Sequence, residues 1–124
     1  MATNRARYLS NLYKRKYGTI GKVASKYIEA GYSVEFMHPT RYGAIHIVAR
    51  GNNQIFAIEV FDKPSTISID VVNNLLEKSK LIKAKPILAI YSNGPRLTDD
   101  AYRFCVENGI KIKRIKEKIN KFRT

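Results

Sequence analysis

A carboxylate and an imidazole stand in two neighbouring apolar stretches of this chain. Glu59 lies within Gln54–Phe61, and His46 lies within Ala44–Arg50. Hard cations such as Mg²⁺ prefer carboxylate oxygens, whereas a neutral imidazole suits softer metals. Side chains two residues apart share one face of a strand, so Phe61 is expected beside Glu59. A lysine at that position would help to stabilise the charge of a phosphate transition state, and Phe61 cannot.

The elements that must position these residues form a β-hairpin. Both stretches are rich in Ile and Val, and Gly51-Asn52-Asn53 between them favours a turn. Because both strands are apolar on both faces, the sheet is expected to be covered on both sides.

The remaining pattern predicts helices and strands on either side of this hairpin. An apolar stripe from Ile20 to Ile28 predicts a helix over Thr19–Ala30 that stops at Gly31. Further elements are a strand at Tyr32–Met37, a helix from Ser68 or Asp70 to about Lys80 and a strand at Pro86–Tyr91. A helix at Asp99–Asn108, capped by Thr98 and stopped by Gly109, and a strand at Ile110–Ile112 follow. A last short helix is expected with Ile115, Ile119 and Phe122 on its apolar edge.

This order of elements defines the expected fold class. Antiparallel strands come first, and crossover units that add parallel strands follow. We expect a single α/β domain over residues 1–124, with a mixed central sheet flanked by helices. Residues 1–16 form a basic N-terminal segment of this domain, and residues 115–124 form a basic C-terminal tail.

The charge of the chain favours a polyanionic partner. Lys and Arg total 23 against 10 acidic residues, which gives a formal net charge of +13. Such an excess attracts nucleic acid, because each phosphate contact releases condensed counterions. Candidate nucleic-acid-binding residues are Arg5, Arg7, Lys14, Arg15 and Lys16 near the start, and Lys111, Lys113, Arg114, Lys116, Lys118, Lys121 and Arg123 near the end. Tyr8, Tyr13 and Tyr17 are interleaved with the first group and could stack on unpaired bases, and Lys78, Lys80, Lys83 and Lys85 form a third basic cluster.

Other features of the sequence narrow the class of protein. Cys105 is the only cysteine, so no internal disulfide is possible, and its apolar neighbours indicate a packed core residue. No signal peptide or long apolar run is evident, which predicts a soluble cytoplasmic protein that does not enter a membrane. The Lys- and Ile-rich composition is typical of thermophiles.

The hairpin resembles the restriction-endonuclease-like, or PD-(D/E)XK, superfamily, and within it the archaeal Holliday junction resolvases. The resemblance covers residues 17–115 and includes Glu-Ala-Gly31-Tyr32, the Gly-x-x-His46-Ile-Val-Ala strand, Ile-Glu59-Val and Lys85-Pro-Ile-Leu-Ala-Ile. It implies that the metal-binding Asp of the family falls at His46, its Glu at Glu59 and its Lys at Phe61. The helical Glu of the family falls at Ile20 or Gly21. Only Glu59 is retained, which implies a protein that binds nucleic acid without cutting it.

Glu59, His46 and Lys63 each have an alternative interpretation. Lys63, just past the strand, could replace the missing lysine and restore cleavage with Mg²⁺. His46 could ligate zinc, although no cysteine or second histidine lies at ligand spacing. We prefer a structural role for Glu59, paired with Arg41, Arg50 or a lysine, because a buried carboxylate needs a partner. We therefore predict no metal, no cofactor and no confident catalytic residue.

The expected function is DNA binding through the basic segments, by an inactive homologue of a resolvase-type nuclease that is a dimer or accompanies an active nuclease. A second interpretation is a non-catalytic subunit of an archaeal tRNA-splicing endonuclease. The segments Tyr42-Gly-Ala-Ile-His-Ile-Val and Ile58-Glu-Val resemble that family. Its catalytic Tyr would fall near Ala49, its His near Asn52 or Asn53, and its Lys near Ala84, so none of the three is present. A third interpretation is a protein-interaction module that regulates an active nuclease, for which an exposed strip of Ile115, Ile119 and Phe122 would argue.

Overall fold

A mixed β-sheet forms the centre of the molecule in a computed structural model that describes residues 3–91 and 94–116. In this part of the chain the sheet has five strands in the order β1-β2-β3-β5-β7. The elements, in chain order, are α1 (Asn4–Tyr17), α2 (Thr19–Glu29), β1 (Ser33–His38), β2 (Ile45–Gly51), β3 (Gln54–Phe61), β4 (Thr66–Ile67), α3 (Ile69–Leu81), β5 (Lys85–Tyr91), β6 (Arg96–Leu97), α4 (Asp99–Glu107) and β7 (Lys111–Ile115).

The direction of the strands changes at β3. The pairs β1–β2 and β2–β3 are antiparallel, whereas β3–β5 and β5–β7 are parallel. A hairpin can join antiparallel neighbours, while parallel neighbours need a crossover, which α3 and α4 supply here. The predicted mixed sheet with a hairpin start is therefore confirmed.

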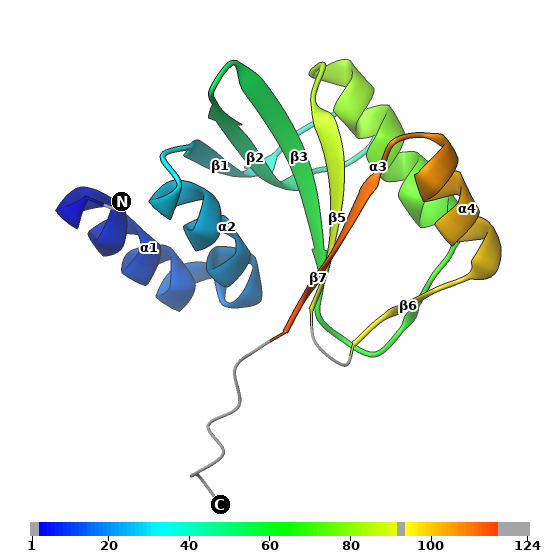
Figure 1. Ribbon diagram of the computed structural model, residues 1–124, viewed down its shortest axis with the longest axis horizontal. Helices are drawn as coiled ribbons and strands as arrows, with labels where there is room; N and C mark the ends of the chain where they lie inside the picture. The colour runs from blue at the N-terminus through cyan, green and yellow to red at the C-terminus, as the bar shows by residue number, and fades with distance from the viewer. Residues whose placement is uncertain (1–2, 92–93, 117–124) are drawn as a thin grey trace, which may run out of the picture.

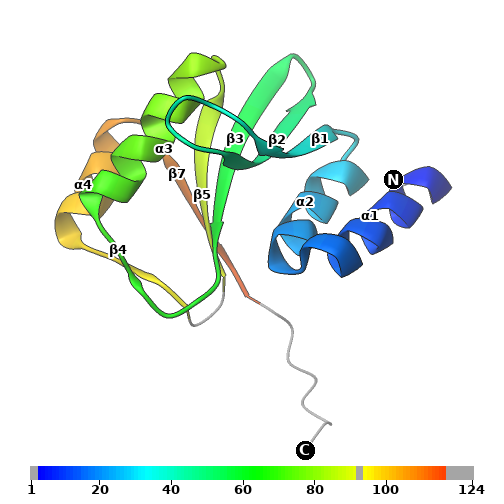
Figure 2. The ribbon, with the colours of Figure 1, turned by 180° about the vertical axis from the view of Figure 1, so that it is seen from behind.

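Helices cover both faces of the sheet (Figures 1 and 2). On one face Val23, Ala24 and Tyr27 of α2 pack against strand residues that include Ile47 and Ile58. On the other face, residues of α3 and α4 pack against β5; they include Val72, Leu75, Ala101 and the buried Cys105. The prediction of a sheet covered on both sides, with Cys105 in the core, is confirmed. No helix in the described ranges is long and apolar enough to cross a bilayer.

The first helix packs against the outer side of α2, away from the sheet (Figure 1). The two helices approach closely at Gly21, where an added Cβ would lie 2.0 Å from the carbonyl oxygen of Tyr13. Only glycine fits there. The basic N-terminal segment is thus a docked helix, which ends where Gly18 takes a positive φ of 58°.

The ends of the other helices follow their capping residues. Thr98 Oγ1 accepts a hydrogen bond from the Ala101 amide at 3.3 Å at the start of α4. Gly31 and Gly109, just beyond α2 and α4, have φ values of 98° and 70°, the left-handed region that glycine tolerates. These predicted helix stops are confirmed.

One predicted short element is wrong, and one short pair of strands was not predicted. Ile115 does not start a last helix: it ends β7, where it is buried against the α2 face and pairs with Tyr91. Ile119 and Phe122 lie outside the described residues. The parallel pair β4–β6 was not predicted, because two-residue strands carry no periodicity to detect.

Candidate functional site

The hairpin ladder ends where His46 and Glu59 face each other. Regular pairing of β2 with β3 runs from Gly51–Gln54 to Ile47–Ile58. Beyond it, the His46 amide donates a hydrogen bond of 2.9 Å to Glu59 Oε2, and the Val60 amide donates one of 2.9 Å to His46 Nδ1. The two side chains therefore provide acceptors for strand amides that no longer have a ladder carbonyl opposite.

The other oxygen of the carboxylate is paired with a lysine from α3. Lys78 Nζ donates to Glu59 Oε1 at 2.9 Å and to the carbonyl oxygen of Ala44 at 2.8 Å. The side chains of Lys78 and Glu59 are only 7% and 11% exposed. Each charge is thus compensated where burial would otherwise penalise it strongly. We call His46, Glu59 and Lys78 the Glu59 cluster.

The same helix also fixes the loop before β2. Asn74 Nδ2 on α3 donates to the carbonyl oxygen of Tyr42 at 3.3 Å, one helical turn before Lys78. An added Cβ on Gly43 would lie 3.8 Å from Lys78 Nζ, and Gly43 has a φ of 113°. The loop therefore passes directly over the lysine, so the Glu59 cluster ties two strands, one loop and one helix together.

These side chains do not fit a Mg²⁺ site. Hard divalent cations take several oxygen ligands, usually from more than one carboxylate. Here the single carboxylate has one oxygen on an ammonium group and the other on a backbone amide. His46 Nδ1 is occupied by the Val60 amide. Within the described ranges, no three His, Cys, Asp or Glu side chains gather where they could hold a metal ion.

The structure brings the three residues of the predicted site together. His46 Nδ1 lies 3.6 Å from Glu59 Oε2, and the His46 and Phe61 ring centroids are 6.4 Å apart. Lys63 is exposed in the segment that follows β3, and no hydrogen bond or ion pair in the described residues joins its side chain to Glu59. Arg50 pairs with Glu35 at 3.2 Å instead of with Glu59.

The residue that the sequence analysis misplaced is Lys78. By sequence it belongs to the third basic cluster with Lys80, yet it is buried against Glu59. The signal was present, because Lys78 follows Val71 and Leu75 at helical spacing and so continues the inward stripe of α3. A lysine on an apolar stripe indicates a buried partner, which here is the lone carboxylate of β3.

The N-terminal basic residues lie along α1. Arg5, Arg7, Lys14, Arg15 and Lys16 are all exposed on this helix. Tyr8 is 63% exposed, but the Tyr13 and Tyr17 rings pack on Phe36 with centroids 4.8 Å and 4.0 Å apart. Of the three tyrosines proposed to stack on bases, only Tyr8 is exposed, since the other two hold α1 against β1.

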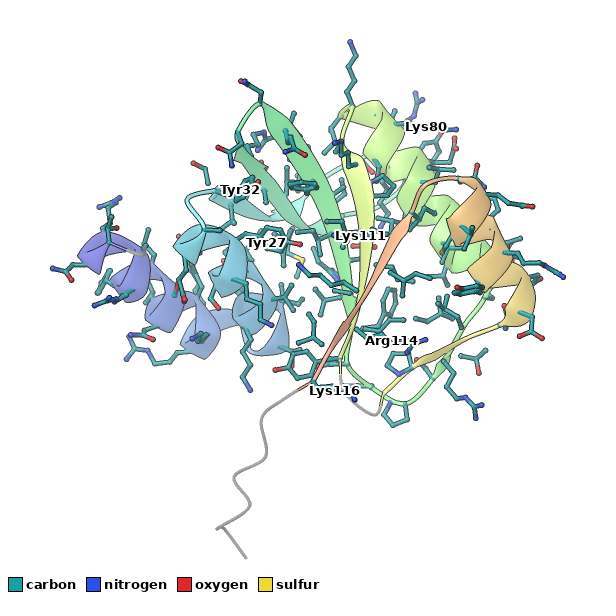
Figure 3. The ribbon with its side chains drawn as sticks, viewed as in Figure 1. Tyr27, Tyr32, Lys80, Lys111, Arg114 and Lys116 are labelled. Atoms are coloured by element: carbon teal, nitrogen blue, oxygen red, sulfur yellow. The ribbon has the colours of Figure 1, made fainter. Side chains whose placement is uncertain are left out.

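The C-terminal basic residues divide between the two faces of β7. Lys111 and Lys113 alternate with Ile112 and lie on the same face as Ile115, the face that α2 covers. Arg114 lies on the other face, and Lys116 follows the strand (Figure 3). Lys118, Lys121 and Arg123 lie outside the described residues.

Charges of one sign meet where β7 passes α2. Lys113 Nζ lies 5.2 Å from the centroid of the Tyr27 ring, over which it is half-buried. The pKa of Lys113 is lowered, first by its burial and then by the neighbouring charges of Lys111 and Lys26. Lys111 and Lys26 are thus close enough to repel the charge of Lys113.

Known structures share this fold. A repair endonuclease from Pyrococcus abyssi aligns with a TM-score of 0.58 and 16% identity, over 94% of this chain and 48% of that chain. EndoMS in its apo form aligns with a TM-score of 0.55 and 16% identity, over 96% of this chain and 49% of EndoMS. EndoMS in complex with dsDNA gives a TM-score of 0.52 and 14% identity, over 97% of this chain and 48% of that one.

These similarities define the class of fold. The chain has the restriction-endonuclease-like fold expected from its hairpin, and it spans about half the length of these endonucleases. No protein-family model and no curated protein matches the sequence.

Proposed function

We propose that this chain is a nucleic-acid-binding protein of nuclease fold that holds DNA through basic surfaces and does not cleave it. The observation that carries the proposal is the Lys78–Glu59 ion pair of 2.9 Å in the position where the resemblance implies metal ligands. An ammonium group bonded to the lone carboxylate opposes a second positive charge at the same place. In this proposal binding needs no metal or cofactor, and Mg²⁺ would matter only if the chain cut DNA.

The charge of the chain supports a polyanionic ligand. The formal net charge is +13, α1 exposes its lysines and arginines, and β7 exposes Lys111 and Arg114. Phosphate contacts of this kind carry no sequence information, so we expect binding that is indifferent to sequence and strongly dependent on salt.

DNA is proposed over RNA because EndoMS, which shares the fold, was solved in complex with dsDNA. The alternative of a tRNA-splicing subunit predicts the opposite preference, for structured RNA. The alternative of a protein-interaction module loses one of its three apolar residues, since Ile115 is buried at the end of β7. A homodimer, or a complex with an active nuclease, remains part of the proposal and is tested by sedimentation with and without DNA.

The proposal is tested by cleavage and binding assays on one set of nucleic acids. Four-way junction, duplex, single strand and tRNA are incubated with Mg²⁺ or Mn²⁺ and then separated on denaturing gels. We expect intact strands, with tighter binding to DNA than to tRNA over a salt titration. Cleavage that disappears in Glu59→Gln or Lys63→Ala would show an active site and overturn the proposal.

A further inference from the structure

Lysines of α2 and of β7 come together where β7 passes α2, because the charges of both Lys26 and Lys111 act on Lys113. Lys22 and Lys26 are four residues apart, so they share one exposed face of α2. Lys111 and Lys113 are two residues apart on the α2 side of β7. Figure 3 shows Lys111 on the side of β7 that faces Tyr27, and Arg114 on the side towards α4. We call these four lysines the α2–β7 groove.

A depression lies beside these lysines. It has a volume of about 330 Å³ and is lined by Lys14, Lys22, Ser25, Lys26, Glu29 and Tyr91. Tyr91 ends β5 and pairs with Ile115 at the end of β7, so the depression lies close to β7, although Lys111 and Lys113 do not line it. Three of its six lining residues are lysines and one is acidic. Its surroundings therefore favour an anion.

Three of the groove lysines have no carboxylate partner in the described residues. In the part of the chain that the structure describes, no ion pair joins Lys26, Lys111 or Lys113 to a carboxylate. Burial lowers the pKa of Lys113 most, and the nearby charges of Lys111 and Lys26 lower it further. A cluster of like charges costs free energy in the unbound protein, and a polyanion seated between them would relieve that cost.

The chemistry of the groove indicates contact with phosphates alone. Tyr27 is 8% exposed and Lys113 covers its ring, so it cannot stack on a base. The described groove therefore offers ammonium groups but no exposed aromatic platform beyond Tyr91, which is half-buried. Ammonium groups act as point charges on phosphate oxygens.

We propose that the α2–β7 groove binds the phosphodiester backbone of DNA, on the face of the sheet opposite the Glu59 cluster. This inference rests on the proposed nucleic-acid-binding function and gives it a location. Glu59 belongs to the α3 side because Lys78 of α3 reaches it, whereas its strand neighbours Ile58 and Val60 pack on the α2 side. DNA held in the groove therefore lies away from the position of the nuclease metal site.

The test compares two double variants that lose equal charge. Lys26→Gln/Lys113→Gln changes the groove, while Arg96→Gln/Arg103→Gln changes exposed positions of β6 and α4, which lie on the other side of the sheet from α2 (Figure 1). Affinity for a fluorescein-labelled duplex is measured by anisotropy over a salt titration. We expect the groove variant to weaken binding by about tenfold or more at 0.1 M salt and to lower the salt slope by about 2. The control variant should change affinity less than twofold.

The outcomes separate the inference from the function on which it rests. If the native chain binds no nucleic acid, the function and the groove both fail. If the native chain binds and both double variants bind equally well, the groove alone is overturned. Two controls show that a loss of affinity comes from the loss of charge and not from misfolding. The urea midpoint of the groove variant should match that of the native chain, and Lys26→Arg/Lys113→Arg should retain binding.

Two further arms address the chemistry of the groove. The groove variant should lose as much affinity for an abasic oligonucleotide as for a base-containing strand of the same length. The losses should be equal because the groove contacts only phosphates. A loss confined to the base-containing strand would overturn the phosphate-only contact. The variant Lys111→Gln/Lys113→Gln tests another role, in which these lysines keep the edge strand β7 from pairing with another molecule. If this variant self-associates while its affinity for DNA is unchanged, the part of these lysines in the groove is overturned.

Discussion

The two faces of the central sheet treat their charges in opposite ways. On the α3 face, Glu59 and Lys78 are buried together and each is hydrogen-bonded. On the α2 face, the charges of Lys26 and Lys111 lie near Lys113, and no carboxylate pairs with these three lysines in the described residues. The difference teaches that a buried charge paired within the protein stabilises the fold, whereas positive charges without a carboxylate partner near the surface are available to bind an anionic partner.

The largest expected effect comes from breaking the buried pair. Lys78→Met should destabilise the protein by about 3–5 kcal/mol, because Glu59 would remain buried without its counter-charge and Ala44 would lose its donor. Urea unfolding measures this loss. The double variant Lys78→Met/Glu59→Gln should recover much of the stability, and Lys80→Met, at an exposed position of the same helix, serves as control. Additive losses in the double variant would contradict the role of the pair.

A smaller effect is expected where α1 meets α2. Gly21→Ala should cost about 1–3 kcal/mol, because its Cβ would overlap the Tyr13 carbonyl and push the helices apart. Asn11→Ala, exposed on α1, should change little. In hydrogen exchange, Gly21→Ala should loosen α1 while the amides of His46 and Val60 stay protected. Equal loss of protection in both regions would show that the two faces are coupled.

The crowding of the lysines can be measured directly. Lys111→Gln removes one of the charges that lower the pKa of Lys113, so that pKa should rise. Saturating DNA should raise it as well, because phosphates favour the protonated form. Because the pKa of Lys113 is lowered in the folded protein, its charge costs stability below that pKa, and the cost disappears as the pH rises through it. NMR titration of the Lys113 side chain follows these changes, and a pKa unaffected by both would argue against a shared groove.

The smallest expected effect concerns an ion pair on the exposed edge strand β1. The pKa of Glu35 is lowered, mainly by its hydrogen bond of 2.8 Å with His38 and further by Arg50, although its own slight desolvation opposes this. Because the folded-state pKa lies below the unfolded one, the pair stabilises the protein above the unfolded pKa, and this is lost as the pH falls through the folded value. Since Glu35 and Arg50 are exposed and His38 is only partly buried, Glu35→Gln should cost less than about 1 kcal/mol at neutral pH and nothing in strong acid. Unfolding measured from pH 7 to pH 3 tests this; a cost that persists in acid would contradict it.

Much of the fold could be predicted because it is encoded by local patterns. The strand Gln54–Phe61, the Thr98 cap and the stops at Gly31 and Gly109 depend on nearby residues, and the structure confirms them. The meeting of His46, Glu59 and Phe61 followed from strand alternation and the hairpin turn.

The remaining features depend on how distant elements pack. Lys78 finds Glu59 because α3 crosses β3, and no spacing in the sequence reports that crossing. The division of Lys113 and Arg114 between two faces required knowing that β7 is the edge strand beside β5. Likewise, no local pattern links Lys22 and Lys26 with β7, because they are far from it along the chain.

The most direct test of the central claim is DNA binding measured with EDTA and with Mg²⁺ at matched ionic strength, followed by a denaturing gel of the same samples. The account predicts equal affinity in both conditions, intact DNA, and the same affinity for Glu59→Gln as for the native chain. Binding or strand cleavage that requires Mg²⁺ and disappears in Glu59→Gln would contradict it.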